Sequence, residues 1–375
     1  MVDKINEKFA GVYDGKCVLV TGHTGFKGSW LVAWLLKLGA RVVGFSDRIP
    51  TQPAMFQELG LESKIEHRIG DVRDAELMNQ LVQSVRPDFV FHLAAQAIVS
   101  TSYKEPLATV STNVMGVANM LEALRHLDYP CTAVIITSDK CYENVEWVWG
   151  YKETDNLGGR DVYSGSKGAA EVIFHSYYWA FFRDTDRTPV RIATGRAGNV
   201  IGGGDWAQDR IIVDCVRSWS NDGVVEIRSP EATRPWQHVL EPLSGYLNLG
   251  AELSRDHRLC GESFNFGPRP EQNKTVVSLL TDLRRHWKRN SKGDAYLITD
   301  NIPFHEAGLL RLNCDKAAFQ LKWEAVLSYA ECIEMVGTWY SNFYCDSPQN
   351  TYELTISQIE QYENSAAKRN LAWSK

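Results

Sequence analysis

The stretch Lys16-Cys-Val-Leu-Val-Thr21-Gly22-His-Thr-Gly25-Phe-Lys-Gly28 decides the fold. Its first six residues are mostly apolar and stop abruptly at a glycine, which predicts a buried strand. An apolar segment of helical length follows, from Ser29 to Leu38, and Gly39 ends it. A glycine-rich turn between a strand and a helix lets the backbone approach a diphosphate at the helix N-terminus. The stretch therefore predicts a dinucleotide site, with a plain helix-entry loop as the alternative.

Further β-rich runs alternate with longer amphipathic segments: Arg41–Phe45, Phe89–Leu93, Ala133–Thr137 and Val190–Thr194. Strands separated by helices pair in parallel through right-handed crossovers, which predicts an α/β fold with a Rossmann-type, doubly wound parallel sheet. After about Gly204 the segments become shorter and richer in Trp, Arg, Pro and Gly. We therefore expect a nucleotide-binding domain over residues 15–200, a smaller α/β substrate lobe over 201–350 that interleaves with it, and a C-terminal tail over 351–375.

Asp47 lies at the end of the second expected strand. It follows the glycines at about the distance at which a carboxylate holds the adenosine ribose in dinucleotide sites. A carboxylate accepts a hydrogen bond from the ribose 2′-hydroxyl and repels a 2′-phosphate, so Asp47 favours NAD. Arg48 could instead bind that phosphate, which leaves NADP open.

The segment Tyr163-Ser-Gly-Ser-Lys167 carries a phenol and an ammonium four residues apart, on one face of a helix. An ammonium near a phenol favours phenolate and would lower a pKa that is ordinarily about 10. A phenolate can take a hydroxyl proton while a hydride leaves the same carbon for a nicotinamide. Ser138 ends a strand before this pair and adds a hydroxyl as the third group. Alone, the Tyr/Lys spacing is also common in surface pairs.

These motifs, together with Gly70-Asp71-Val72 and His92-Leu-Ala-Ala-Gln96, resemble the extended short-chain dehydrogenase/reductase family from about Gly15 to Tyr344. The resemblance implies NAD as the cofactor and Ser138, Tyr163 and Lys167 as the redox triad. It further implies residues 71–72 beside the adenine and residues 93–96 along the phosphates and ribose. The residues expected at the cofactor are Gly22, His23, Thr24, Gly25, Phe26, Gly28, Asp47, Arg48, Asp71, Val72, Leu93, Ala94, Ala95, Gln96, Tyr163 and Lys167.

Asp139 and Lys140 directly follow the serine. A simple reductase or epimerase does not need this acid–base pair, and the alternative is a solvated ion pair at a strand end. In position the pair resembles the nucleotide-sugar 4,6-dehydratases, whose members with deoxythymidine or guanosine substrates mostly carry Glu where this chain has Lys140. Lys140 and the phrases 198–206 and 234–239 resemble the branch that uses cytidine diphosphate sugars. The resemblance implies Tyr163 as the base at C4, Asp139 as the acid at the C6 hydroxyl and Lys140 as the candidate base at C5.

A group of basic and amide side chains follows the last expected strand of the sheet. Arginine is well suited to a diphosphate, and the resemblance implies that Asn199 and Arg234 hold that of a nucleotide sugar. Each residue could equally be a structural hydrogen-bonder, Asn265 could form a turn, and Asn113 could shape the helix that carries Tyr163. The residues expected at the substrate are Lys140, Arg196, Asn199, Arg234, Gln237 and His238.

The composition excludes several classes of protein. A formal net charge of −6 over 375 residues disfavours a dedicated nucleic-acid binder. The apolar run Leu31–Leu36 is too short to span a bilayer, so no membrane partner is expected. The eight cysteines include no C-x-x-C pair, no export signal is visible, and no His/Cys cluster has metal-ligand spacing. We expect reduced thiols, a cytoplasmic location and no metal.

Three functions stay open. The first is a nucleotide-sugar 4,6-dehydratase, the second a 4-epimerase or decarboxylase of the same family, and the third a non-catalytic Rossmann protein that senses NAD. The family implies a homodimer formed through a four-helix bundle, and bacterial surface-polysaccharide (O-antigen) synthesis as its setting. Candidate dimer contacts, or alternatively intramolecular core, are Val117, Met120, Leu121, Tyr177 and Trp179.

Overall fold

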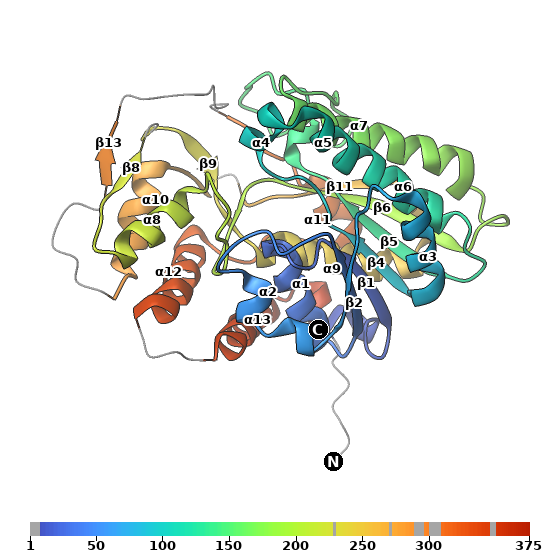
Figure 1. Ribbon diagram of the computed structural model, residues 1–375, viewed down its shortest axis with the longest axis horizontal. Helices are drawn as coiled ribbons and strands as arrows, with labels where there is room; N and C mark the ends of the chain where they lie inside the picture. The colour runs from blue at the N-terminus through green and yellow to red at the C-terminus, as the bar shows by residue number, and fades with distance from the viewer. Residues whose placement is uncertain (1–7, 228–229, 270–271, 289–295, 300–308, 346–349) are drawn as a thin grey trace, which may run out of the picture.

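The computed structural model describes residues 8–227, 230–269, 272–288, 296–299, 309–345 and 350–375 (Figure 1). Within them, a seven-stranded parallel sheet has the strand order β11-β6-β5-β4-β1-β2-β3. The expected doubly wound α/β class is confirmed. The strands are β1 Cys17–Thr21, β2 Arg41–Ser46, β3 Glu66–Ile69, β4 Phe89–His92, β5 Cys131–Ile136, β6 Val190–Ala197 and β11 Ser263–Phe266.

The strand order reverses between β1 and β4. Thr21, the last residue of β1, is in register with His92, the last residue of β4. In open parallel sheets, ligands bind beyond the carboxyl ends of the strands at such a switch point. The topology therefore brings the glycine-rich turn after β1 and the loop after β4 together at one edge.

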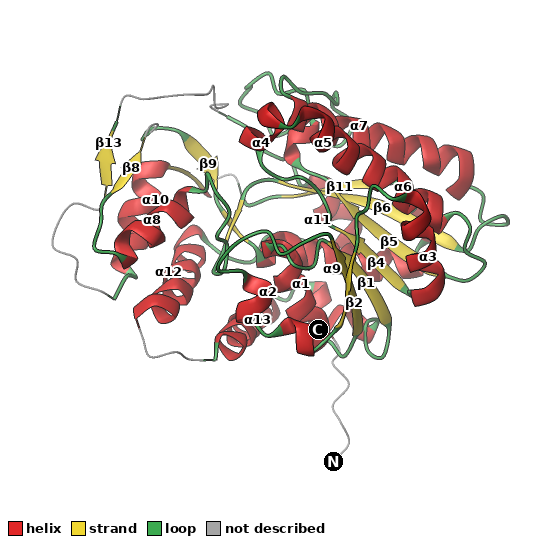
Figure 2. Ribbon diagram, in the orientation of Figure 1, coloured by secondary structure: helices red, strands yellow, loops and turns green. Residues whose placement is uncertain are grey.

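Helices cover both faces of the sheet (Figure 2). A crossover helix in a parallel sheet must bury an apolar side against the strands, which is why these segments are strongly amphipathic or wholly apolar. On one face lie α3 Ala75–Val85, α6 Gly116–Leu124 and α7 Val162–Tyr177, with α4 Val99–Lys104 and α5 Pro106–Val110 beside α7. On the other face lie α1 Phe26–Lys37, α9 Leu240–Arg255 and α13 Thr351–Lys368.

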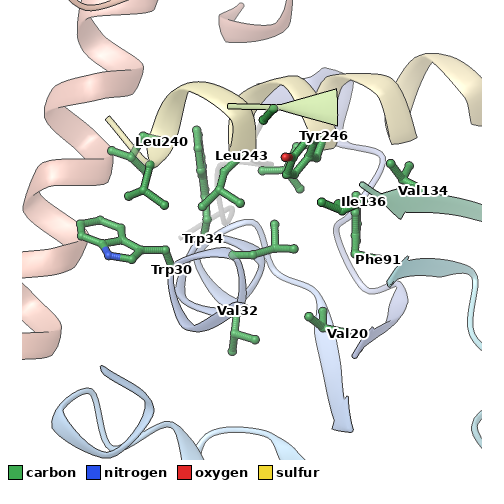
Figure 3. Packing of buried hydrophobic residues seen from close by; sticks show 14 of the residues in the cluster. Val20, Trp30, Val32, Trp34, Phe91, Val134, Ile136, Leu240, Leu243 and Tyr246 are labelled. Carbon is green, nitrogen blue, oxygen red and sulfur yellow. The ribbon is translucent and has the colours of Figure 1, made fainter. Parts of the chain in front are cut away.

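The core between the sheet and α1 and α9 contains large side chains (Figure 3). Trp30 and Trp34 of α1 and Leu243 of α9 have no exposed surface. The Trp30 indole donates to the carbonyl oxygen of Gly203 at 2.9 Å, so its polar atom is satisfied inside the core. Burying each such side chain stabilises the fold by roughly 1.5–3 kcal/mol, and the cluster fixes α1 beneath the sheet.

The second lobe, at the left of Figure 1, consists of short elements. Its strands pair two by two: β7 with β10 and β8 with β13 in parallel, and β9 with β12 antiparallel. The chain crosses back to the sheet through α9 and β11, so the two parts interleave. The elements of this lobe are β7 Val200–Ile201, α8 Ile211–Ser220, β8 Val225–Ile227, β9 Thr233–Pro235, β10 Gln237–His238, β12 Asn273–Thr275, α10 Val276–Arg285, β13 Tyr296–Ile298 and α12 Tyr329–Cys345. Two short helices lie elsewhere in the chain, α2 Met55–Glu58 and α11 Asp315–Leu321.

The segment 351–375 is not the tail that the sequence analysis expected. It forms α13 and packs into the core: Trp34 Nε1 donates to Glu363 Oε1 at 2.8 Å, and Tyr362 Oη donates to Glu241 Oε2 at 2.7 Å. Trp373 then stacks on Phe9 with ring centroids 4.9 Å apart. Both ends of the described chain therefore pack against the nucleotide-binding half.

Candidate active site

The glycine-rich turn after β1 has room for backbone only. Gly22 has φ 74°, and a Cβ there would lie 2.8 Å from the amide nitrogen of Ala94. A Cβ at Gly28 would lie 2.2 Å from the carbonyl oxygen of Gly22. Gly25 caps the N-terminus of α1 without a side-chain hydrogen bond. The turn thus presents the helix N-terminus to a ligand, and this geometry fits the diphosphate of a dinucleotide.

The His23 ring points away from the turn, into the protein. Its Nδ1 lies 2.9 Å from Ser46 Oγ and its Nε2 lies 2.6 Å from His67 Nδ1, and burial lowers the pKa of His23 to about 4. The ring is therefore neutral near pH 7 and braces β1 against β2 and β3. Only the backbone of His23 remains available to the expected cofactor.

The expected ribose-binding carboxylate is on the surface beside its neighbour. Arg48 Nε lies 3.0 Å from Asp47 Oδ2 at the carboxyl end of β2. Thr24 Oγ1 donates to the carbonyl oxygen of Arg48 at 2.6 Å, which joins this strand end to the glycine-rich turn. Phe26 packs toward the second lobe, since a Cβ at Gly202 would lie 3.0 Å from Phe26 Cζ.

The residues expected around the adenine follow β3. Asp71 accepts hydrogen bonds from the backbone and Nε of Arg73, and the side-chain bond to Arg73 holds the pKa of Asp71 below its usual range. Val72 is buried, and its carbonyl oxygen accepts from Asn119 Nδ2 at 2.9 Å. The segment is thus held against α6.

The loop after β4, which contains Leu93, Ala94 and Ala95, is joined to α7 by the amide side chain of Asn113. Gln96 N donates to Asn113 Oδ1 at 2.8 Å, and Asn113 Nδ2 donates to Ser166 Oγ of α7 at 2.9 Å. The Gln96 side chain donates to Ile98 O and Thr109 Oγ1, so it stabilises the loop rather than pointing freely to a ligand. Asn113 lies where it can shape the placement of α7, as the sequence analysis expected.

The structure brings Ser138 and Tyr163 together at the carboxyl end of β5, and Lys167 lies one helical turn beyond Tyr163 on α7. Ser138 Oγ donates to Asp139 Oδ1 at 2.9 Å, accepts from Lys140 N at 3.2 Å, and is also hydrogen-bonded to the Tyr163 hydroxyl. Asp161 caps the N-terminus of α7 by accepting from Ser164 N, which fixes the turn that carries Tyr163. The hydroxyl pair and the carboxyl group thus share one small site.

Burial controls the pKa values of the Tyr/Lys pair. It raises the pKa of Tyr163 to about 12 although the bond to Ser138 lowers it, and it lowers the pKa of Lys167 to about 8. The expectation of a lowered phenol pKa is therefore wrong, because desolvation outweighs the effects of Ser138 and of the positive charge of Arg210.

Lys167 makes stability depend on pH. Its pKa falls from 10.5 unfolded to about 8 folded, so burying the ammonium costs about 3 kcal/mol below pH 8. This cost disappears as the pH rises from about 8 to about 10.5, because the folded protein then loses the proton first. The free energy of unfolding of Lys167→Met should therefore exceed that of wild type by the largest amount at neutral pH. This difference should decline between about pH 8 and 10. Denaturant unfolding across this range measures the difference, and a pH-independent difference would contradict the assignment.

Asp139 and Lys140 form a 3-10 turn at the cleft between the sheet and the second lobe. Asp139 is buried, and a Cβ at Gly198 would lie 3.1 Å from its Oδ2, so glycine at 198 leaves room for this carboxyl group. Lys140 is half-buried. The cavity beside them brings together three residues expected at the substrate; its lining residues are Asp139, Lys140, Asn199, Arg234, Pro235 and Leu310.

The other expected substrate residues are internal, which corrects the sequence analysis. Arg196 is 1% exposed and forms an ion pair with Glu171 at 2.8 Å. Gln237 is buried beside β11, with Nε2 3.5 Å from Phe266 O. His238 accepts from Leu240 N through Nδ1, packs on the Trp30 ring and has a pKa lowered to about 3 by burial. These three residues support the site from within rather than line it.

Lys27 is a residue of the site that the sequence analysis missed. Burial and the positive charge of Arg210 lower its pKa to about 8, while the carboxylates of Asp139 and Asp205 raise it. The Lys27 ammonium thus lies within electrostatic range of Asp139, although Lys27 belongs to the glycine-rich turn. A charged residue in the first turn of an otherwise apolar helix was the only signal in the sequence.

Arg311 is a second missed residue. With its amide oriented to satisfy its neighbours, Asn273 accepts from Arg311 Nη2 at 2.9 Å and donates to the carbonyl oxygen of Arg234 at 3.2 Å. Within the described part of the chain, the buried Arg311 Nε has no hydrogen-bond partner. Asn273 thus joins the Arg311 side chain to the backbone of Arg234 at the second lobe. An arginine in a loop far along the chain gives no pattern that reveals this neighbour.

Comparison with known proteins places the chain in a family. A family model described as GDP-mannose 4,6 dehydratase matches residues 19–336. The chain belongs to this family. The resemblance to the nucleotide-sugar 4,6-dehydratases is confirmed, since CDP-glucose 4,6-dehydratase from Salmonella typhimurium is 43% identical over 342 residues, 91% of this chain and 93% of the relative.

Further proteins are similar to this chain. A CDP-paratose 2-epimerase from Salmonella typhi is 25% identical over 87% of this chain and 99% of its own. An epimerase structure from Methanothermobacter thermautotrophicus has TM-score 0.75 and 23% identity, covering 95% of this chain and 98% of its own. A dTDP-glucose 4,6-dehydratase structure from Bacillus anthracis in complex with NAD has TM-score 0.70 and 20% identity, covering 88% of this chain and 97% of its own. The two solved structures support the fold.

Two further findings concern partners. Among the described residues, no group of three or more His, Cys, Asp or Glu side chains is arranged to hold a metal ion. No helix in the same part of the chain has both the length and the apolar character that crossing a membrane requires.

Proposed function

We propose that this chain is a CDP-glucose 4,6-dehydratase, a hydro-lyase that converts CDP-D-glucose into CDP-4-dehydro-6-deoxy-D-glucose and water. One observation carries the proposal: the buried Asp139 is hydrogen-bonded to Ser138, which is itself bonded to Tyr163. Groups for oxidising an alcohol and a group for expelling a hydroxyl therefore share one site. The relative from Salmonella typhimurium at 43% identity supports the cytidine substrate.

The proposed cofactor is NAD. The close approach at Gly22 and Gly28, the uncapped N-terminus of α1 and the carboxylate of Asp47 fit a dinucleotide with a free 2′-hydroxyl. Bound there, NAD supplies a hydride acceptor and donor, so the reaction consumes no external oxidant.

The residues of the chain supply the proton transfers. The Tyr163 oxygen takes the proton of the C4 hydroxyl as C4 is oxidised to a carbonyl, which makes the C5 proton acidic. Lys140 takes that proton and later returns it to C5. Asp139, protonated for this step, gives its proton to the C6 hydroxyl, which leaves as water. Reduction at C6 completes the 4-keto-6-deoxy sugar, and the proton that Tyr163 took from the C4 hydroxyl restores that of Asp139. The sum is loss of one water with no net oxidation.

The proposed diphosphate site is the pair Arg234 and Arg311, with Asn199 beside Arg234 in the cavity. Guanidinium groups bind phosphate oxygens through planar, paired hydrogen bonds. The buried Nε of Arg311, which has no hydrogen-bond partner among the described residues, gives a donor for such an oxygen. The smaller lobe would then hold the nucleotide sugar, and the sheet the cofactor.

Two other functions remain alternatives, a 4-epimerase of the same family and a non-catalytic NAD-sensing protein. An epimerase product has the mass of its substrate, whereas the dehydratase product has lost one water. Incubation with CDP-glucose, followed by mass and NMR analysis of the sugar, tests the proposal. A product of unchanged mass would favour the epimerase, and no product with CDP-, dTDP-, GDP- or UDP-sugars would favour the sensing protein.

Lys140→Ala should separate oxidation from elimination. We expect C4 oxidation to persist, while loss of water slows by about 10²–10⁴-fold because no base takes the C5 proton. Turnover of CDP-glucose and exchange of the C5 hydrogen with heavy water measure the two steps. Lys152→Ala is the matched control, because Lys152 is exposed and lies further along the same segment between β5 and α7. Unchanged turnover in Lys140→Ala would remove this lysine from the mechanism.

A homodimer is also proposed. Exposed apolar side chains lie on α5 and α7 and on the turns that follow them: Leu107, Val110, Met115, Val172 and Trp179. Of the expected contacts, Val117, Met120 and Leu121 are buried within the subunit, and Trp179 is 61% exposed. The exposed set supports pairing through these helices, and light scattering of the purified protein tests it. The eight free cysteines support a cytoplasmic location.

A further inference from the structure

A buried polar network lies directly beneath the catalytic residues. Its centre is Glu171, which has no exposed surface and whose pKa is lowered to about 2, since Arg196 and Thr137 stabilise the carboxylate. Arg196 donates to both oxygens of Glu171 at 3.0 and 2.8 Å. Thr194 and Ser263 also donate to this carboxylate. The network therefore joins α7 to strands β5, β6 and β11.

The network extends to the segment after Lys140 through one hydroxyl. Arg196 Nη1 donates to Tyr142 Oη at 2.7 Å, and Tyr142 Oη donates to Asn265 Oδ1 at 2.8 Å. The Arg196 guanidinium also lies over the Tyr142 ring, 5.0 Å from its centroid. Tyr142 is 1% exposed, so its hydroxyl acts as acceptor and donor without water.

The two ends of this chain of bonds carry different parts of the machinery. Glu171 is one helical turn beyond Lys167 on α7, the helix that also carries Tyr163. Tyr142 follows the 3-10 turn that carries Asp139 and Lys140, and its amide donates to Asp139 O at 3.3 Å. The bond between Arg196 and Tyr142 thus sets the distance between the groups for oxidation and the groups for elimination.

We propose that Tyr142 is a positioning residue for the elimination step, holding Asp139 and Lys140 against the sugar while α7 holds Tyr163 and Lys167. The inference rests on the proposed dehydratase function and deepens it. A displacement of about 1 Å in a catalytic group can cost about 100-fold in rate. Loss of the Tyr142 hydroxyl should therefore slow elimination and leave C4 oxidation nearly intact, since Glu171 and Arg196 still hold α7.

The test is Tyr142→Phe, which keeps the ring and removes the hydroxyl. We expect kcat to fall by about 10–100-fold with little change in KM. Isotope effects separate the two steps: with CDP-glucose deuterated at C4 or at C5, the variant should show a smaller C4 effect and a larger C5 effect than wild type. Because these effects are ratios, a smaller fraction of folded protein does not change them.

The matched control is Tyr151→Phe. The Tyr151 ring stacks on Tyr142 with centroids 5.3 Å apart, but its hydroxyl bonds only the outer loop, to Asn144 Oδ1 and Val145 N. This variant should keep the wild-type kcat and isotope effects. Arg196→Lys keeps a cation beside Glu171 but loses the guanidinium nitrogen that donates to Tyr142, so it should reproduce the isotope pattern of Tyr142→Phe. It replaces Tyr142→Phe in the test if that variant does not fold.

The outcomes distinguish this inference from the proposed function. If wild type releases water from CDP-glucose and Tyr142→Phe shows wild-type kcat, or a lowered kcat with the wild-type isotope pattern, the positioning role is wrong and the dehydratase stands. If wild type releases no water, the dehydratase proposal itself is wrong and the positioning role falls with it.

Discussion

Tyr163→Phe should lower the kcat for dehydration of CDP-glucose by about 10²–10⁴-fold. The variant loses the only oxygen of the side chain, which is hydrogen-bonded to Ser138 and would take the C4 proton. The ring stays 7% exposed in the same packing, so binding of the nucleotide sugar should change little. Steady-state turnover and calorimetric binding of CDP-glucose measure the two quantities.

Tyr129→Phe is the control for this prediction. Its hydroxyl is buried and has no hydrogen-bond partner among the described residues, and it lies near Cys131 at the start of β5. Removing that oxygen should leave kcat unchanged. If Tyr163→Phe kept more than about a tenth of the wild-type kcat, the C4 proton would have to go to another group.

Asp139→Asn should slow release of water by about 10²–10⁴-fold while C4 oxidation continues. The hydrogen bond from Ser138 to Asp139 is 2.9 Å long, and an amide can still accept it. The amide has no acidic proton to give to the C6 hydroxyl. Quenching the reaction with borodeuteride should therefore trap hexose labelled at C4 that keeps its C6 oxygen. The wild-type protein under the same quench should give 6-deoxy sugars.

Asp155→Asn is the control for the acid. Asp155 is partly exposed, and its side chain accepts from the backbone amide of Lys152, so its amide variant should release water at the wild-type rate. Rapid release of water by Asp139→Asn would show that another group protonates the leaving oxygen.

The fold was largely predictable because its strong signals are local. The five strands expected from apolar β-branched runs, β1, β2, β4, β5 and β6, occur within a few residues of the expected bounds. The polar edge strand β3, Glu-His-Arg-Ile, escaped because an edge strand with one neighbour needs no apolar run. Strand β11 escaped prediction because it is only four residues long and joins its partner β6 through α9 from far along the sequence.

The site was predictable where chemistry and spacing coincide. Ser138, Asp139 and Tyr163 lie together because a strand end and a helix face meet there. Burial was not predictable from residue type: Arg196 and His238 carry side chains typical of binding sites, yet both lie inside the protein. Lys27 and Arg311 were missed because tertiary contacts alone bring them to the site.

The central claim is that one site oxidises a sugar at C4 and reduces it again at C6 after water has left. The most direct measurement uses CDP-glucose deuterated at C4 and locates the deuterium in the isolated product by NMR. The account predicts deuterium on C6 of the 6-deoxy sugar. Deuterium released to solvent, or still attached to C4, would contradict it.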